Sequence, residues 1–295
     1  MTTLNRPGKP LAVVSFVLLC TTLFAVPIYA LNGEETVTPY GDNSAVGKYA
    51  TVNGIEVYYE VYGERDPMVL IHGSGQSIEA MEHQVAFFAD KYQVIVADSR
   101  AHGKSGLGEG PLNYRQMASD MAALLNHLGV EKTRLVGWSD GGIIGLLLAI
   151  QYPQTIAELA IMGANLQPDT SAVYPWAVEW VASQSRQIDQ MLAAGDTSQN
   201  WALLKQHFSL LREQPNISLE ELGTISIPAL VMAGDRDIIR EEHTLKIYQN
   251  LQKAHLAIFP GETHFTPATN PQLFNSTVDK FMGQPFTRPN SSDML

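Results

Sequence analysis

One short stretch constrains the fold of this chain more than any other: a Gly-x-Ser-x-Gly sequence at residues 137–141. Residues 133–136 before it and residues 143–150 after it are largely apolar. This order predicts a strand, a tight turn with Ser139 at its apex, and a helix. Such a turn bends so sharply that side chains at its flanking positions would collide, which explains the two glycines. The helix then points its N-terminal amides and the positive end of its dipole at the serine.

Strand and helix patterns alternate on both sides of this stretch. Asn53-Gly54 lies between two β-rich runs and predicts a hairpin over residues 49–62. Short, wholly apolar runs predict strands that are buried on both faces, as in a parallel sheet. The chain is therefore expected to form an α/β fold, with a mostly parallel central sheet flanked by helices. The further predicted strands are 68–71, 92–97, 133–136, 156–162, 229–233 and 255–259, and the helices are 78–89, 114–128, 143–150, 241–251 and 271–282.

The alternation stops between residues 165 and 225, where only helical stretches are found. We interpret residues 165–225 as a helical cap inserted into an α/β core made of residues 48–164 and 226–283. Most aromatic side chains of the cap are expected to pack it against the core. A cap lies over the strand ends where ligands bind in such sheets, so Trp176 and Trp180 are candidate substrate contacts, together with Trp138.

The first thirty residues have a different composition. Arg6 and Lys9 form a short positive region, and residues 11–30 carry no charge. The segment ends in Ile-Tyr-Ala, which resembles a signal-peptidase site, so residues 1–30 are predicted to be a cleaved signal peptide of an exported protein, periplasmic or secreted. In the alternative, residues 11–30 stay in place as a membrane anchor, because twenty uncharged residues can span a bilayer.

The remaining composition sets limits on partners. Cleavage after Ala30 would remove Cys20, the one cysteine, and an exported protein of this size does not need disulfides. A net charge of −11 argues against nucleic acid as a partner. Neither Cys-x-x-Cys nor His-Glu-x-x-His occurs, so no metal or cofactor is expected. Residues 31–47 have the composition of a linker and residues 284–295 that of a flexible tail.

A serine hydroxyl is a poor nucleophile at neutral pH and needs a base within hydrogen-bond reach, which a carboxylate in turn orients. Two loops after late predicted strands can supply these groups. The first contains Asp235 and Asp237, and the second contains His264. Of the eight histidines, only His264 directly follows a late strand and a glycine-containing loop. Ser139, His264 and one of the two aspartates therefore form a candidate catalytic triad.

A His-Gly-Ser-Gly run at residues 72–75 follows the predicted strand 68–71. A loop at this place can donate a backbone N–H to an oxyanion, with a second N–H from the residue after the nucleophile. We assign these two donors to the amides of Ser74 and Asp140. The carboxylate of Asp140 could also attract a substrate amine, or it could point away so that only the amide matters.

With these four motifs in order, the chain resembles the α/β-hydrolase superfamily from about Tyr49 to Met282. Residues 98–105 are similar to the structural Asp-x-Arg-Gly-x-Gly-x-Ser turn of that family, with Ala101 in place of the usual glycine. The acid of the family is usually the last residue of Gly-x-x-Asp, so the resemblance implies Asp237 rather than Asp235.

The resemblance also narrows the expected activity. Gly-Trp-Ser-Asp-Gly-Gly and the later Gly-Ala-Asn at residues 163–165 look like the branch that contains valacyclovir hydrolase-like esterases, carboxylesterases, enol-lactonases and C–C hydrolases. This implies a cofactor-independent serine hydrolase that cleaves a small-molecule carboxylic ester through an acyl-enzyme. A lactonase, C–C hydrolase or perhydrolase would use the same machinery, and a non-catalytic ligand receptor on this fold is the alternative from another class.

Overall fold

The computed structural model describes residues 39–294 of the chain. Residues from Pro39 onward form one compact unit. The expected signal peptide or anchor at residues 1–30 lies outside the described residues, as does the first part of the expected linker. Within residues 39–294, no helix is both long enough and apolar enough to cross a bilayer.

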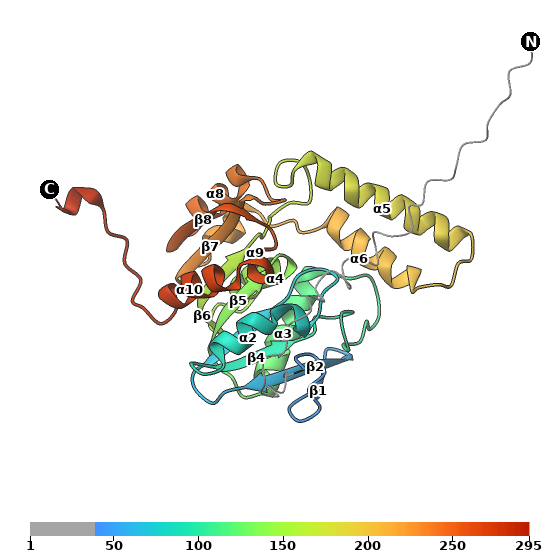
Figure 1. The fold of residues 1–295 in the computed structure, drawn as a ribbon, viewed down its shortest axis with the longest axis horizontal. Helices are drawn as coiled ribbons and strands as arrows, with labels where there is room; N and C mark the ends of the chain where they lie inside the picture. The colour runs from blue at the N-terminus through green and yellow to red at the C-terminus, as the bar shows by residue number, and fades with distance from the viewer. Residues whose placement is uncertain (1–38, 295) are drawn as a thin grey trace, which may run out of the picture. The chain divides into compact units, whose positions relative to one another are not determined.

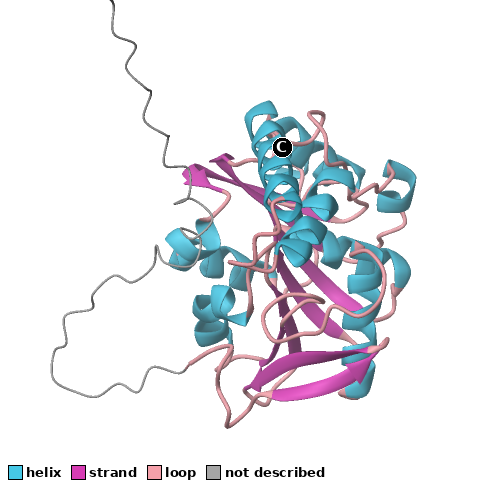
Figure 2. Cartoon of the chain, turned by 90° about the vertical axis from the view of Figure 1, so that its right-hand side faces the viewer, coloured by secondary structure: helices cyan, strands magenta, loops and turns pink. Residues whose placement is uncertain are grey.

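Eight strands form a single sheet in the order β1-β2-β4-β3-β5-β6-β7-β8 (Figures 1 and 2). The β1–β2 and β2–β4 pairs are antiparallel, and all other neighbours are parallel. This confirms the predicted mostly parallel α/β sheet. The strands are β1 Lys48–Val52, β2 Ile55–Tyr62, β3 Pro67–Ile71, β4 Gln93–Ala97, β5 Thr133–Trp138, β6 Ile156–Met162, β7 Ala229–Arg236 and β8 Ala254–Thr263.

Helices cover both faces of the sheet, and each face has its own apolar core. Successive residues of β3 show why: Val69 belongs to the core on one face and Leu70 to the core on the other, because side chains alternate along a strand. The helices are η1 Ile78–Met81, α2 Glu82–Phe88, α3 Tyr114–His127, α4 Asp140–Gln151, α5 Pro175–Ala193, α6 Trp201–Glu213, α7 Leu219–Gly223, α8 Glu241–Asn250, α9 Thr266–Thr269, α10 Pro271–Phe281 and η2 Ser291–Met294.

The segment between β6 and β7 carries α5, α6 and α7, and α5 packs along α6 (Figure 1). His207 of α6 contacts the turn after β4. Its Nε2–H donates to the carbonyl of Ala101 at 3.0 Å, and its ring stacks on His102 with centroids 4.4 Å apart. Ala101 itself has a φ of 64°, in the left-handed region that glycine favours. The exact cap and core boundaries stay predictions.

Part of the expected linker is held against the sheet by Glu60, whose side chain is completely buried. Its carboxylate accepts the backbone N–H of Gly41 at 2.9 Å and that of Asn43 at 3.0 Å. The hydroxyls of Tyr58 and Tyr62 donate to the same carboxylate at 2.7 and 2.8 Å. Four donors satisfy a carboxylate that would otherwise be costly to bury.

The expected flexible tail also contacts the folded unit. The ring of Phe286 lies 4.8 Å from that of His255, and Arg288 Nη2 donates to the hydroxyl of Tyr248 at 3.0 Å. A polar composition alone does not reveal such contacts, because they depend on single side chains.

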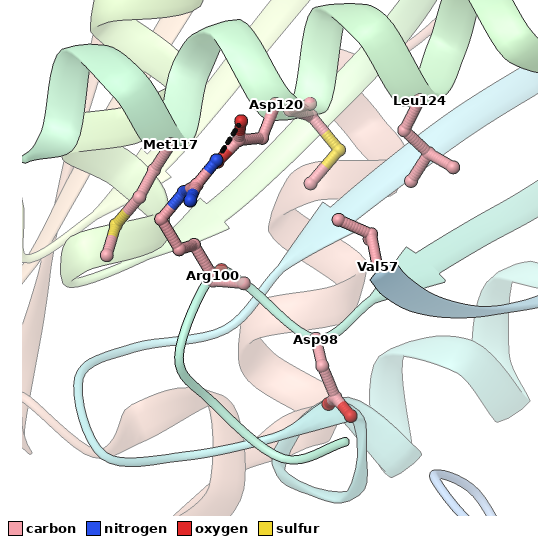
Figure 3. Close-up of a pocket in the computed structure, with 8 residues that line it drawn as sticks. Val57, Asp98, Arg100, Met117, Asp120 and Leu124 are labelled. Carbon is pink, nitrogen blue, oxygen red and sulfur yellow. Dashed lines mark hydrogen bonds and ion pairs between the residues drawn. The ribbon is translucent and has the colours of Figure 1, made fainter. Parts of the chain in front are cut away.

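A buried ion pair fastens the turn after β4 to α3 (Figure 3). Arg100 Nε and Nη2 donate to the two carboxylate oxygens of Asp120 at 2.6 and 2.8 Å. Both side chains are nearly inaccessible to solvent. The adjoining cavity has a volume of about 10 Å³, which admits about one water molecule at most. Water therefore has little access to the ion pair in the intact protein.

Replacing Arg100 with methionine should lower the free energy of unfolding by about 3–5 kcal/mol, because it leaves the Asp120 carboxylate buried without its cation. Urea denaturation monitored by circular dichroism measures this change. The matched control is Lys205→Met, at the exposed Lys205–Asp189 pair, where we expect a change below about 1 kcal/mol. Equal losses in the two variants would contradict the prediction.

Candidate active site

Ser139 lies at the turn between β5 and α4, with a left-handed backbone at φ 56° and ψ −118°. A Cβ atom at Gly137 would overlap the carbonyl oxygen of Gly141. This confirms that the tight turn itself excludes a side chain there. A Cβ atom at Gly141 would instead overlap the carbonyl oxygen of Ile71. The second glycine is therefore required by the close approach of α4 to β3, which the sequence did not show.

The structure brings Ser139, His264 and Asp237 together. His264 Nε2 lies 2.9 Å from Ser139 Oγ, and His264 Nδ1 lies 2.6 Å from Asp237 Oδ1. The Asp237 carboxylate is fully buried and the imidazole nearly so. A carboxylate behind the imidazole fixes its tautomer, so that Nε2 faces the hydroxyl as an acceptor.

The strands that precede Asp237 and His264, β7 and β8, are longer than the sequence predicted. Pairing of β7 with β8 continues past an irregularity at Gly234 to the pair Arg236–Thr263. Asp237 and His264 each follow the last paired residue of their strand. Sequence patterns end these strands early because glycine and charged residues interrupt the apolar runs, whereas the backbone pairing does not require apolar side chains.

The two candidate aspartates have different partners. Asp237 Oδ1 meets the imidazole and also accepts the backbone N–H of Ile239 at 3.1 Å. Asp235 Oδ1 accepts the backbone N–H of Gly261 at 2.9 Å. The structure thus places the aspartate implied by the family resemblance beside His264, and it gives Asp235 a contact that joins the ends of β7 and β8.

The loop after β3 lies directly against the serine. A Cβ atom at Gly73 would be 3.1 Å from the Cβ of Ser139. In the described part of the chain, the backbone N–H groups of Ser74 and Asp140 donate to no other residue. Both amides are therefore free to donate to an oxyanion, as the sequence predicted for them.

Two side chains hold this loop: Gln76, which the sequence analysis did not single out, and His72, which belongs to the His-Gly-Ser-Gly run but was given no side-chain role there. The Oε1 atom of Gln76 accepts the backbone N–H of Gly73 at 2.9 Å. His72 Nδ1 donates to the carbonyl of Gly73 at 2.8 Å, and its Nε2 accepts the backbone N–H of Ser99 at 3.0 Å. Burial lowers the pKa of His72, which keeps this ring neutral. Only their position next to the loop could have suggested these roles.

The three candidate substrate contacts occupy different surroundings. Trp138 is buried, with 2% of its surface exposed, and its indole N–H donates to the carbonyl of His264 at 2.8 Å. Trp176 and Trp180 are exposed on α5, at 62% and 48%. The sequence analysis missed Phe265, which is 46% exposed and lies edge-on to the His264 ring at 5.7 Å.

The side chain of Asp140 is turned into the protein and is 4% exposed. Burial raises its pKa to about 6, although the nearby hydroxyls of Tyr114 and Ser74 partly offset this effect. Its Oδ2 atom and the Tyr114 hydroxyl are both buried, and neither reaches good hydrogen-bond geometry with another described residue. The carboxylate is therefore poorly compensated when it is charged.

This burial predicts a pH-dependent stability. The pKa of Asp140 is about 6 in the folded protein and about 3.9 in an unfolded chain, so folding becomes less favourable as the pH rises from 4 to 6. Replacing Asp140 with asparagine should raise the free energy of unfolding at pH 8 by about 2–3 kcal/mol, with little change at pH 4. Urea denaturation at the two pH values measures this difference. Asp189→Asn, at an exposed pair, should show no such gain, and a gain that is equal at both pH values would contradict the prediction.

The fold and the site together define an α/β hydrolase: a mostly parallel sheet, a serine on a left-handed turn, and an imidazole and a carboxylate at the ends of later strands. Residues 66–212 match the sequence family described as the alpha/beta hydrolase fold. The chain belongs to the α/β-hydrolase superfamily.

Individual relatives cover most of the chain. Human serine hydrolase BPHL is 27% identical over 261 residues, which are 82% of this chain and 88% of that protein. The 3-oxoadipate enol-lactonase 2 of Acinetobacter baylyi is 26% identical over 261 residues, 79% of this chain and 95% of that protein. The structure of the enol-lactonase from Burkholderia xenovorans has the same fold, with a TM-score of 0.67 at 22% identity over 80% of this chain and all of that one.

Proposed function

We propose that this protein is a serine hydrolase that cleaves a small-molecule carboxylic ester through an acyl-enzyme. The observation that carries the proposal is the continuous hydrogen-bonded series from Ser139 Oγ through His264 to Asp237, with distances of 2.9 and 2.6 Å. Nucleophile and base are already within the reach that proton transfer requires. The similarity to a serine hydrolase and to an enol-lactonase supports the same chemistry, since a lactone is a cyclic ester.

The geometry supports the following reaction. Ser139 Oγ attacks the ester carbonyl carbon while its proton passes to His264 Nε2. The carbonyl oxygen becomes negative and accepts the N–H groups of Ser74 and Asp140. His264 then gives the proton to the departing alkoxide, which leaves as the alcohol. Water, deprotonated by the same nitrogen, then attacks the acyl carbon; the bond to Ser139 Oγ breaks, the carboxylic acid leaves, and the proton on His264 Nε2 passes to Ser139 Oγ. Asp237 stabilises the imidazolium in both steps.

Two alternatives are less well supported. A ligand receptor would gain nothing from the left-handed backbone of Ser139, which costs on the order of 1–3 kcal/mol for a residue other than glycine. Recognition of a substrate amine by the Asp140 carboxylate is not favoured, because that side chain is buried beside Tyr114. The amide of Asp140 remains the group that would meet the substrate.

Replacing Ser139 with alanine should lower kcat for p-nitrophenyl esters by at least about 10⁴-fold, because it removes the hydroxyl that lies 2.9 Å from His264 Nε2. The stability should stay close to that of the unaltered protein. A fluorophosphonate probe should label the unaltered protein and not the variant. Ser183→Ala, on the exposed surface of α5, is the control and should retain full activity. Undiminished esterase activity in Ser139→Ala would refute the proposal.

A substrate panel separates the bond types. We expect p-nitrophenyl esters of increasing acyl length to be hydrolysed faster than lactones, and amino-acid esters to have no advantage over plain acyl esters. Turnover of lactones alone, lost in Ser139→Ala, would reassign the activity to a lactonase. A clear preference for amino-acid esters that disappears in Asp140→Asn would restore the amine hypothesis.

We further propose that the protein is exported and that residues 1–30 are removed. The supporting observation is the sequence itself: a positive start, an uncharged segment and a small residue at the cut. N-terminal sequencing of the protein from the periplasm or the medium should begin at Leu31. A full-length chain found in the membrane fraction would instead favour the anchor.

A further inference from the structure

We propose that Trp138 is a positioning residue that holds the catalytic base at its distance from the nucleophile. This inference depends on the proposed function, because it assigns a role to a residue that acts through His264. Trp138 is the last residue of β5 and directly precedes Ser139. From the sequence it was a candidate substrate contact, and its surroundings in the structure point to this different role.

The indole of Trp138 faces the protein interior. Only 2% of the residue is exposed, and it belongs to the apolar core that also contains Met162 and Phe259. The Trp138 side chain therefore lies among the apolar residues of this core, whereas the Ser139 hydroxyl lies against His264 Nε2. A side chain in this position contacts the loops that form the site rather than the substrate.

The one polar atom of the Trp138 side chain, its indole nitrogen, forms a hydrogen bond with His264. The indole N–H of Trp138 donates to the backbone carbonyl of His264 at 2.8 Å, a distance typical of a well-formed hydrogen bond. The two residues are 126 positions apart in the chain. In the described part of the chain no other side chain donates to this carbonyl, so without the indole it would remain buried and unpaired.

Ring contacts reinforce this hydrogen bond. Phe265, the residue after the base, lies edge-on to the indole, with centroids 6.1 Å apart and planes at 89°. It is also edge-on to the imidazole of His264, with centroids 5.7 Å apart and planes at 86°. Aromatic pairs prefer such perpendicular arrangements. Trp138 therefore contacts the main chain of the base and the side chain that follows it.

His264 is thus restrained from three directions. The carboxylate of Asp237 holds Nδ1, and the backbone of Gly163 lies so close that a Cβ atom there would be 2.6 Å from the same nitrogen. Gly163 is linked to Ser139 through its neighbour Met162, whose carbonyl accepts the N–H of Ser139 at 2.8 Å. The third contact is the more direct link, because its donor Trp138 is bonded covalently to Ser139. Its removal loosens one of the restraints on the distance between Ser139 Oγ and His264 Nε2.

The test removes the indole N–H in two variants, of which only the second keeps the shape of the indole. In Trp138→Phe, and in a protein with 3-benzothienylalanine at position 138, no indole N–H is present. We expect kcat for a p-nitrophenyl ester to fall by about 10- to 100-fold, because small displacements of a catalytic group have effects of this size. KM should change less than about threefold, because Trp138 does not contact substrate. The rate constant for fluorophosphonate labelling should fall in parallel with kcat.

Two controls separate this role from a structural one. A fluorotryptophan at position 138 keeps the N–H and should retain kcat. Trp201→Phe removes another buried indole, whose N–H donates to Asp196 within the helical segment, and should lose stability without losing kcat. The benzothienyl analogue keeps the shape of tryptophan, so it gives an answer even if Trp138→Phe does not fold.

Unchanged kcat in the benzothienyl protein would overturn the inference, and so would a change confined to KM. A fall in kcat that occurs equally in the fluorotryptophan protein would also overturn it. Ser139→Ala distinguishes this failure from failure of the proposed function. If Ser139→Ala is inactive and the Trp138 variants are fully active, only the role of Trp138 is wrong. If Ser139→Ala keeps its activity, the proposed function itself is wrong.

Discussion

The close packing of α4 against β3 is the contact on which the rest of the site depends. Gly141 lies so near the carbonyl of Ile71 that no side chain fits between them. Ile71 ends β3, and the loop that follows it contains the amide of Ser74. The same contact therefore fixes the position of Ser139 relative to the sheet and the position of the loop that follows β3. One backbone contact therefore positions both the Ser139 hydroxyl and the loop that contains the Ser74 amide.

The sheet supplies the second part of the arrangement. The carboxyl ends of parallel strands all lie at one edge of the sheet. Residues that follow β5, β7 and β8 therefore lie near one another, whatever the conformation of the individual loops. The extended pairing of β7 with β8 carries this edge as far as Asp237 and His264. Strand pairing brings Asp237 and His264 together, and local hydrogen bonds then set the orientation of their side chains.

Much of this could be read from the sequence. The Gly-x-Ser-x-Gly turn, the buried strands and the order of Ser139, the aspartates and His264 each have a local pattern with a physical cause. The choice between Asp235 and Asp237 has no such pattern, because both follow the same strand and only the path of the chain decides which faces the imidazole. The resemblance to the α/β-hydrolase superfamily implied the residue that the structure places there.

Side-chain direction at the turn could not be predicted for a similar reason. Trp138 and Asp140 flank the nucleophile, and both looked like candidate substrate contacts, yet both are buried. The partner of Trp138 is 126 residues away, and the surroundings of Asp140 include Tyr114 of another helix. Contacts between distant segments leave no periodic signal. The contact of His207 with Ala101 was not predicted for the same reason.

The stacked pair His102 and His207 has a consequence for how the helical segment sits on the core. Burial, the main cause, lowers the pKa of His102 to about 3, and it lowers the pKa of His207 as well. Both stacked rings are therefore neutral near pH 7. Counterions do not screen a contact between uncharged groups, and near neutral pH there is no proton to gain or lose. The contact of α6 with the turn after β4 should therefore be insensitive to salt and to pH near neutrality. Its contribution to stability depends on the burial of the two rings.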